Sequence, residues 1–319
     1  MNIVTGAFGF VGSHLAEFLL SRGEDVAALS HPVPPENNYR YLASNPEARR
    51  LRVVLADVRS LDALKLLFRS LKPEVVYHLA ALASHRLSLD NPYPYLETNI
   101  TTVLNVLEAA RVTEPSPRII FSSSSSVYGD NSPPLREDMK PMPKGPYALS
   151  KSIGEELCMH YNKTYGVDCV VVRYFNVVGE RCRSNIVLRI FADRIVKGED
   201  VEVYGRIVDG VFKPAVRDFT YVGDVVKGTV LAAERGRAGE VYNIGYGRPV
   251  SVLNIAYFLM KHIGRETGVV YKELKPHEAL ESYCDNSKAR EELGWKPEVD
   301  VEETVKRYVR WYMSELAPR

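Results

Sequence analysis

The chain has 319 residues, of which 45% are hydrophobic, and a formal net charge of +1, enough for one large domain or two modest ones. Mixed charges without a basic stripe exclude nucleic acid as the expected partner, and no apolar run approaches the ~18 residues of a membrane-spanning helix. Four cysteines without C-x-x-C spacing, and an N-terminus without a charged leader, predict a reduced, cytoplasmic protein with no metal site.

The first predicted unit is a strand, a glycine-rich turn and a helix. Met1–Thr5 has the apolar body of a buried strand, and Ser13–Leu20 repeats apolar residues at helical spacing. The glycines between them permit a tight turn, close approach of a pyrophosphate and close packing of helix on strand, and the helix N-terminus attracts an anion. The spacing is G-x-x-G-x-x-G, so a glycine-rich turn that binds nothing is the alternative. The candidate cofactor-binding residues here are Gly6, Phe8, Gly9, Phe10, Val11 and Gly12.

The end of the second predicted strand, Asp25–Ser30, bears on the choice between NAD and NADP. Dinucleotide folds usually place a carboxylate there for the adenosine ribose. This chain has Ser30 and His31 instead, which removes a group that repels a 2′-phosphate. Either His31 or Arg40 meets such a phosphate, or Ser30 simply bonds a ribose hydroxyl of NAD, and both interpretations stay open.

The next two predicted strands, Leu51–Ala56 and Glu74–Leu79, flank a helix over Leu61–Leu71. Asp57 either accepts a hydrogen bond from the adenine amino group or caps that helix, although Ser60 suits the cap better. Small residues after the fourth strand let the backbone lie along the cofactor. The candidates from this stretch are Asp57, Val58, Leu79, Ala80 and Ala81.

Five serines, Ser122–Ser126, follow the predicted strand Pro117–Phe121 and stand where ligands bind in open α/β sheets. The preceding helix, Pro92–Arg111, contains Asn99, which either bonds backbone near the nicotinamide or is an ordinary polar residue. A further helix runs from Pro146 to Tyr165. It carries two further candidates on one face because they are four residues apart, Tyr147 and Lys151.

Six strands alternating with helices, the last of them Asp168–Tyr174, predict a parallel doubly wound Rossmann sheet of the α/β class. A looser pattern then predicts a smaller C-terminal substrate-binding α/β lobe. We expect a dinucleotide-binding domain over residues 1–176, with 217–246 returning to it, and the lobe over 177–216 and 247–319. The later expected elements are helix Asn185–Lys197, strand Val201–Tyr204, loop Gly205–Pro214, helix Gly223–Arg235, strand Val241–Ile244, and helices Ser251–Ile263, Asn286–Leu293 and Val301–Leu316.

Taken together, the chain resembles the nucleotide-sugar epimerases and dehydratases of the extended short-chain dehydrogenase/reductase family, over nearly its whole length. The resemblance implies a homodimer that pairs through the helices Pro92–Arg111 and Tyr147–Tyr165. The outer faces of these helices carry Leu104, Leu107, Leu157 and Tyr161, unless the core of the monomer buries these side chains. The markers, in order, are Thr5-Gly6-x-x-Gly9-x-x-Gly12, Asp57, His78-Leu79-Ala80-Ala81, Asn99, Ser122–Gly129, Tyr147-x-x-x-Lys151, Arg173-Tyr174-Phe175-Asn176 and Arg217-Asp218.

Within that family the serine run separates the reactions. Members that dehydrate a 4-keto sugar carry an acidic residue in the triplet that matches Ser124–Ser126, and this chain has none. The resemblance therefore implies an NAD-dependent 4-epimerase that interconverts UDP-glucose and UDP-galactose, and also UDP-GlcNAc and UDP-GalNAc if the pocket admits them. An NAD(P)-dependent reductase of a nucleotide 4-keto sugar is the alternative. A cofactor-binding regulator without catalysis is a third reading.

The expected catalytic residues are Ser124, Tyr147 and Lys151. A free tyrosine has a pKa of about 10, so the nearby ammonium and a positive nicotinamide ring are expected to lower the pKa of Tyr147. Tyr147 then takes the proton from the sugar 4-hydroxyl while C4 gives hydride to the nicotinamide, and Ser124 bonds the same oxygen. The remaining cofactor-binding candidates are Asn99, Ser122, Tyr147, Lys151 and Tyr174.

The nucleotide diphosphate needs fixed anchors. Arg217 is the best candidate, unless Arg217 and Asp218 form an ordinary surface ion pair. Lys275 matches a position where family members often have arginine. Ser282 matches a gatekeeper tyrosine that excludes N-acetyl sugars. The full set of substrate-binding candidates is Ser124, Ser125, Tyr147, Asn176, Asn185, Tyr204, Arg217, Lys275, Glu278 and Ser282.

Overall fold

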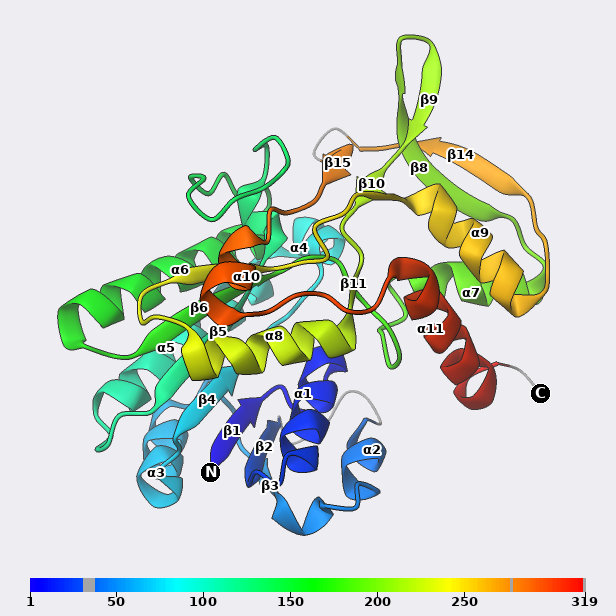
Figure 1. The fold of residues 1–319 in the computed structure, drawn as a ribbon. Helices are drawn as coiled ribbons and strands as arrows, with labels where there is room; N and C mark the ends of the chain where they lie inside the picture. The colour runs from blue at the N-terminus through cyan, green and yellow to red at the C-terminus, as the bar shows by residue number, and fades with distance from the viewer. Residues whose placement is uncertain (31–37, 276–277, 318–319) are drawn as a thin grey trace.

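A seven-stranded parallel sheet runs through the centre of the computed structural model, which describes residues 1–30, 38–275 and 278–317. The strand order is β12-β6-β5-β4-β1-β2-β3, with helices on both faces (Figure 1), which confirms the predicted doubly wound fold. The order reverses between β1 and β4, and ligands bind such sheets beside this point, at the carboxyl ends of the strands. The strands are β1 (Asn2–Thr5), β2 (Val26–Ser30), β3 (Leu51–Leu55), β4 (Val75–His78), β5 (Arg118–Ser124), β6 (Cys169–Tyr174) and β12 (Val241–Ile244).

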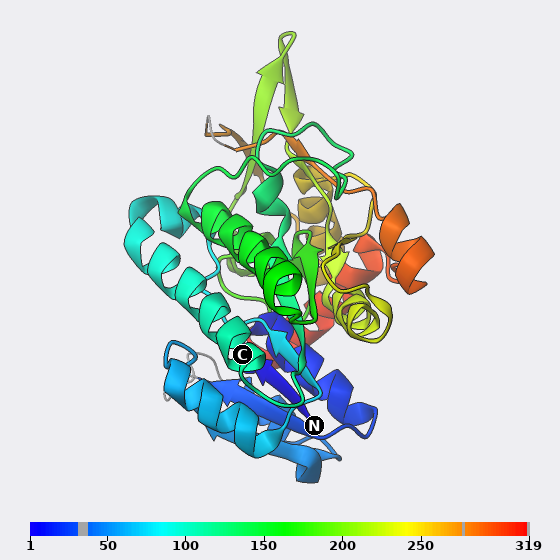
Figure 2. The ribbon, with the colours of Figure 1, turned by 90° about the vertical axis from the view of Figure 1, so that its left-hand side faces the viewer.

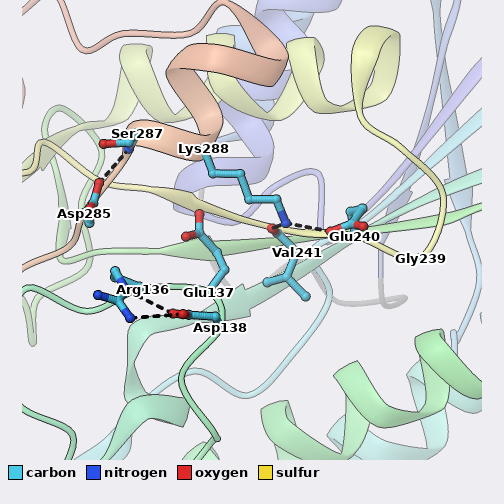
Figure 3. Close-up of a pocket in the computed structure, with 9 residues that line it drawn as sticks. All are labelled: Arg136, Glu137, Asp138, Gly239, Glu240, Val241, Asp285, Ser287 and Lys288. Carbon is cyan, nitrogen blue, oxygen red and sulfur yellow. Dashed lines mark hydrogen bonds and ion pairs between the residues drawn. The ribbon is translucent and has the colours of Figure 1, made fainter.

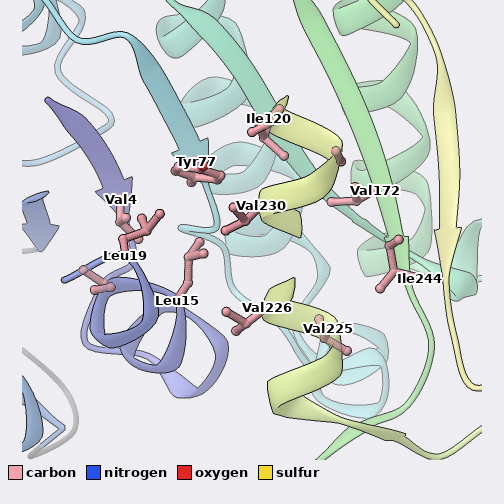
Figure 4. Close-up of a cluster of buried hydrophobic side chains, with 14 of the residues drawn as sticks. Val4, Leu15, Leu19, Tyr77, Ile120, Val172, Val225, Val226, Val230 and Ile244 are labelled. Atoms are coloured by element: carbon pink, nitrogen blue, oxygen red, sulfur yellow. The ribbon is translucent and has the colours of Figure 1, made fainter. Parts of the chain in front are cut away.

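Two layers of helices bury the two faces of this sheet. On one face, α1 and α8 share a hydrophobic cluster with the strands, in which Val4, Leu15, Ile120 and Val226 are buried (Figure 4). On the other face lie α3, α5 and α6, the last two side by side (Figure 2). The helices are α1 (Phe10–Ser21), α2 (Tyr39–Ala43), α3 (Leu61–Leu71), α4 (His85–Asp90), α5 (Pro92–Arg111), α6 (Pro146–Tyr165) and α8 (Val222–Arg235), with short 3₁₀ turns η1 (Ala48–Arg50) and η2 (Ser125–Tyr128).

The side chains expected on the outer faces of α5 and α6 divide between core and surface. Leu107 and Tyr161 belong to the buried cluster between these helices and the sheet, and Leu157 packs against it. Leu104 is 39% exposed. The interpretation that the monomer core buries these residues therefore holds for Leu107 and Tyr161, and the homodimer remains a prediction.

A second group of elements stands beyond the carboxyl edge of the sheet. A three-stranded sheet of order β14-β8-β9 lies with α7, α9 and α11, whose apolar faces share a cluster that includes Leu188, Leu259 and Tyr308. Small pairings connect the two groups: β10 pairs with β13 and β15, and β7 with β11. The bounds are β7 (Val177–Val178), α7 (Val187–Lys197), β8 (Val201–Val208), β9 (Val211–Pro214), β10 (Val216–Arg217), β11 (Thr220–Tyr221), β13 (Val250–Ser251), α9 (Val252–Ile263), β14 (Val269–Glu273), β15 (Glu281–Ser282), α10 (Ser287–Leu293) and α11 (Val301–Glu315).

The expected loop Gly205–Pro214 is instead a β-hairpin, the long projection at the top of Figure 1. Its turn residues Asp209 and Gly210 have φ values of 53° and 77°, the left-handed pair that a tight hairpin turn needs. The Asp-Gly dipeptide carried this signal, and the prediction missed it. The helices α2 and α4 and the strand β14 were also not predicted, because each is too short for a periodic pattern.

Among the described residues, no helix combines the length and the apolar character that crossing a bilayer requires.

Candidate active site

The glycine turn joins β1 to α1 at the carboxyl edge of the sheet. Gly6 has a φ of +67°, and a Cβ on it would come within 3.0 Å of the Ala80 backbone. A Cβ on Gly12 would lie 2.1 Å from the Gly6 carbonyl oxygen, so the turn requires glycine at both positions. Gly9 caps α1, whose first turn has no acidic residue, so its N–H groups and the helix dipole favour an anion. The geometry fits the pyrophosphate of a dinucleotide.

The side chains of Phe8 and Phe10, both predicted to contact a cofactor, are buried in the two hydrophobic clusters. Val11 is partly buried and packs against both clusters. These three residues therefore offer a cofactor chiefly their backbone, and their contact with it stays a prediction.

Thr5 is a site residue that the sequence prediction did not single out. Its Oγ1 accepts hydrogen bonds from the backbone N–H groups of Leu79 and Ala80, both at 3.1 Å. The same hydroxyl bonds Nδ1 of His78 at 2.9 Å. Thr5 thus fixes the loop after β4 against the end of β1, where the strand order reverses. Burial lowers the pKa of His78 to about 3, so its imidazole is neutral at physiological pH.

Three residues were candidates for the adenosine end of the cofactor: Ser30, His31 and Arg40. Ser30 ends β2 and is buried. The guanidinium of Arg40 donates to Glu315 in α11 and to the Tyr41 hydroxyl at 2.9 Å, so the expectation that it meets a 2′-phosphate is not supported. His31 lies outside the described residues.

The carboxylate of Asp57 forms an ion pair with Arg59, at 2.7 Å, and leaves the helix cap to another residue. That residue is Ser60, whose side chain accepts from the N–H of Ala63 at 3.3 Å. The alternative in which Asp57 caps α3 is therefore wrong. Asn105 donates to the carbonyl oxygen of Val58 at 3.2 Å and fixes the backbone there.

The face of α6 that carries Tyr147 and Lys151 meets the serine run at the end of β5. Ser124 lies close enough to Tyr147 to act on the pKa of its hydroxyl, which it lowers. Ser124 also accepts from Ser126, from its N–H at 3.2 Å and its hydroxyl at 3.0 Å. Ser125 begins the 3₁₀ turn beside them and is half-buried.

The electrostatics of this pair differ from the expectation. Burial raises the pKa of Tyr147, while the Ser124 hydrogen bond and the charge of Arg183 act in the opposite direction. The Lys151 ammonium instead donates to the carbonyl oxygen of Ser122 at 2.7 Å and lies 4.9 Å from the centre of the Phe121 ring. The prediction that Lys151 lowers the pKa of Tyr147 is therefore wrong for the protein alone. The cation that acts on this pKa is Arg183.

Three of the other cofactor candidates use their side chains within the fold. The amide of Asn99 pairs with the backbone of Leu82, at 2.8 and 3.0 Å, which is the backbone role that one interpretation gave it. The Ser122 hydroxyl donates to the His78 carbonyl oxygen at 3.0 Å. The Tyr174 hydroxyl bonds Thr229 at 2.8 Å. The side chains of Ser122 and Tyr174 thus support the sheet, and their contact with a cofactor stays a prediction.

Several substrate candidates converge across β10 and β15. Arg217 and Ser282 are register partners in these strands. Arg217 donates to the carbonyl oxygens of Val216 and Leu280, at 2.8 and 3.0 Å, and burial lowers its pKa. The charges of Glu278 and Arg86 both act on it.

Arg86, on α4, was not predicted as a site residue. Its guanidinium pairs with Glu278 at 2.8 Å and lies 5.3 Å from the centre of the Tyr204 ring. Glu278 also accepts from the backbone N–H of Lys275 at 3.2 Å. The fold thus gathers the predicted Tyr204, Lys275 and Glu278 near Arg217, with Arg86 as a second cation.

The alternative of a surface ion pair between Arg217 and Asp218 is wrong. Asp218 has no exposed surface, and its carboxylate accepts from Thr220 and from the N–H groups of Tyr246 and Gly247, at 2.6 to 2.9 Å. Asp218 holds the surrounding loops together, whereas Arg217 donates to backbone carbonyl oxygens.

Asn176 and Asn185 are both exposed, at the end of β6 and just before α7. The backbone carbonyl of Asn176 accepts from the N–H of Thr220 at 3.3 Å. Their proposed contacts with a substrate remain predictions.

A polar hollow of about 450 Å³, drawn in Figure 3, is lined by other residues. Its charges pair with one another, as in Arg136 with Asp138 and Lys288 with Glu240. Val241 begins β12, so this hollow lies toward the amino end of that strand rather than at the candidate site. The described ranges contain no cluster of three or more side chains suited to a metal ion.

Comparisons with known proteins agree with this geometry. A family model described as GDP-mannose 4,6 dehydratase matches residues 3–308. A UDP-glucuronate 4-epimerase of Thermodesulfobacterium geofontis is 34% identical over 314 residues, covering 97% of this chain and 95% of that protein.

Two solved structures have the same fold with a TM-score of 0.88 each. One is the UDP-glucose 4-epimerase of Thermus thermophilus in complex with NAD, 31% identical and covering 99% of this chain and 100% of that chain. The other is the UDP-glucuronic acid 4-epimerase of Bacillus cereus with UDP-glucuronic acid and NAD, 32% identical and covering 98% and 99%.

Proposed function

Since the chain belongs to the nucleotide-sugar epimerase and dehydratase family, we propose that it is an NAD-dependent UDP-sugar 4-epimerase that interconverts UDP-glucose and UDP-galactose. One observation carries the proposal: Tyr147 meets Ser124 at the carboxyl edge of the sheet, with no carboxylate in the Ser124–Ser126 triplet. A tyrosine and a hydroxyl suffice to move the proton of a sugar hydroxyl, whereas elimination of water needs a further acid and base.

NAD fits the residues present, because the glycine turn and the N-terminus of α1 suit its pyrophosphate. Bound there, NAD would supply a hydride acceptor and a positive charge. The matching solved structures are complexes with NAD, which favours NAD over NADP.

The side chains of the protein transfer the proton, orient the sugar and anchor the diphosphate. Tyr147 takes the proton of the 4-hydroxyl as the bond to hydrogen at C4 breaks, and Ser124 orients that oxygen. Lys151 holds the end of β5 through the carbonyl oxygen of Ser122. Arg217 anchors the diphosphate, with Glu278 and Tyr204 near the nucleotide. A fixed diphosphate lets the 4-keto sugar turn over and receive hydride on its other face.

The test is incubation of the purified protein with UDP-glucose or UDP-galactose, without added cofactor. The same equilibrium mixture is expected from both sides, with no net NADH. In a second assay with added NADPH and a nucleotide 4-keto sugar, stoichiometric consumption of NADPH would identify a reductase instead. Bound cofactor without turnover in either assay would identify a regulator.

UDP-glucuronate is a second candidate substrate, and Arg183 is the observation that favours it. Arg183 places a positive charge near the Tyr147 hydroxyl, and its Nη1 donates to the Ala83 carbonyl oxygen. In a uronate, the carbon next to C4 carries a carboxylate, which a guanidinium binds well. Relatives named UDP-glucuronate 4-epimerase add to this candidate.

We expect Arg183→Gln to lower kcat/KM for UDP-glucuronate about 10- to 100-fold, the effect of losing a charged hydrogen bond of about 1.5–3 kcal/mol. At a pH above the acidic limb of the rate profile, turnover of UDP-glucose is expected to change by less than about threefold, since its C5 substituent is neutral and makes only a weaker, uncharged contact. Equal losses on both sugars, measured by initial rates, would show that Arg183 does not read the carboxylate.

A substitution of Ser282 tests the size of the sugar pocket. The small side chain beside Arg217 predicts that UDP-GlcNAc is accepted. Ser282→Tyr is expected to reduce UDP-GlcNAc turnover more than about tenfold, because the added ring fills the space of the acetamido group, and to spare UDP-glucose. Ser282→Ala is the control. If the wild-type protein does not turn over UDP-GlcNAc, the gatekeeper assignment is wrong.

A further inference from the structure

The serine run contains a residue that the proposed reaction does not use. Ser123 lies between Ser122, whose carbonyl oxygen binds Lys151, and Ser124, whose hydroxyl meets Tyr147. The Ser123 hydroxyl donates to Glu155 of α6. Tyr147, Lys151 and Glu155 are spaced four residues apart on α6, so one face of this helix holds three successive serines at the end of β5.

Glu155 is buried, and both of its carboxylate oxygens are hydrogen-bonded. It is 5% exposed, and both of its oxygens accept from Arg173 of β6, from Nε at 2.9 Å and Nη2 at 2.6 Å. The Arg173 guanidinium lies 4.6 Å from the centre of the Tyr128 ring. A buried ion pair adds little net stability, because the loss of hydration offsets the attraction. Its presence beside the catalytic helix face therefore calls for another role.

The charges around Lys151 indicate that role. Lys151 is 4% exposed, and burial lowers its pKa to about 8, against the opposing charge of Glu155. On the same helix, burial raises the pKa of the Cys158 thiol, which stays neutral. From β4, His78 is neutral as well. From β6, Arg173 is positive and partly offsets the charge of Glu155.

We propose that Glu155 is a positioning residue of the epimerase: it anchors Ser123 and supplies the negative charge that keeps the Lys151 ammonium protonated at neutral pH. The role in catalysis rests on the function proposed above, whereas the charge state of Lys151 can be measured without any turnover.

The direct test is Glu155→Gln, which keeps the shape and one acceptor oxygen, replaces the other oxygen by an amide NH2 donor, and removes the charge. Lysine labelled with ¹³C at Cε reports the pKa of Lys151 by NMR, with Lys151→Arg to assign the signal. Loss of the carboxylate is expected to lower this pKa by about one unit or more. The ammonium is then lost at lower pH, so the alkaline limb of the kcat profile moves to lower pH by the same amount.

Two further variants separate charge from structure. Ser123→Ala removes the hydrogen bond and keeps the charge, so the pKa of Lys151 is expected to stay within about 0.3 units of wild type, well inside the range of charge effects. If Glu155→Gln leaves Arg173 unpaired and does not fold, Glu155→Gln with Arg173→Gln gives a neutral pair. Its shift is expected in the same direction but smaller, because the opposing charge of Arg173 is also gone.

A folded variant without the carboxylate, with an unchanged Lys151 pKa, would overturn the proposal. A shifted pKa in a protein that turns over no UDP-sugar would instead support the charge role and refute the proposed function. The two failures are thus distinguishable.

Discussion

Tyr147→Phe is expected to lower kcat by about 10²- to 10⁴-fold, the usual contribution of a positioned acid or base, and to leave the bound NAD content unchanged. The change removes only the hydroxyl, on whose pKa Ser124 acts. The start of α6 should persist, because the Tyr147 N–H bonds the Ser88 hydroxyl at 3.2 Å through the backbone. Product formation from UDP-galactose measures the loss, and absorbance of nucleotide released on denaturation measures NAD.

Tyr95→Phe is a matched control for this prediction. Tyr95 is a buried tyrosine near Tyr147, but it is not assigned to the chemistry. Its loss of one hydroxyl should change kcat by less than about threefold, a fraction of what a positioned acid or base contributes. Unchanged activity in Tyr147→Phe would refute the assigned base, and equal losses in both variants would point to disturbed packing.

The pH dependence of activity follows from the same group. Burial raises the pKa of Tyr147, so the protein alone holds the phenol protonated at neutral pH. The charge of Arg183 and that of the bound cofactor both favour the phenolate. We expect the acidic limb of the kcat profile to move to higher pH in Arg183→Gln, since one positive charge is lost.

The sequence predicted the cofactor side of this fold well, for local physical reasons. The bounds of α3, α5 and α6 agree with prediction, because their apolar periodicity is strong and proline opens α5 and α6. Tyr147 and Lys151 on one helix face follow from helical spacing alone. The turn before α1 was recognisable because glycine is required where backbone meets backbone.

The residues that were missed act across long separations in the chain. Arg86 pairs with Glu278, and Arg173 pairs with Glu155 of another element. No local pattern marks such partners. The direction of the Lys151 ammonium also depends on β5, which offers the Ser122 carbonyl oxygen. Helical spacing determines the face of the helix on which a side chain lies, but the neighbouring element determines its hydrogen-bond partner.

The glycine turn yields the second prediction of large effect, in which two alanine substitutions have different outcomes. Gly12→Ala places a Cβ 2.1 Å from the Gly6 carbonyl oxygen, a clash between backbone segments that no rotamer relieves. We expect a loss of at least about 1–3 kcal/mol in the free energy of unfolding, a lower melting temperature and no retained NAD.

Gly9→Ala separates binding from folding at the same turn. Gly9 has a φ of −75°, which alanine adopts freely, and its Cβ would lie 3.2 Å from the Gly6 oxygen, a contact that a small shift relieves. The melting temperature should therefore stay close to wild type. The methyl group would still occupy the space where a pyrophosphate approaches the backbone, so NAD content is expected to fall at least about tenfold. Full NAD content in a stable Gly9→Ala protein would place the pyrophosphate elsewhere, and the function proposed for Tyr147 would then lose its hydride acceptor.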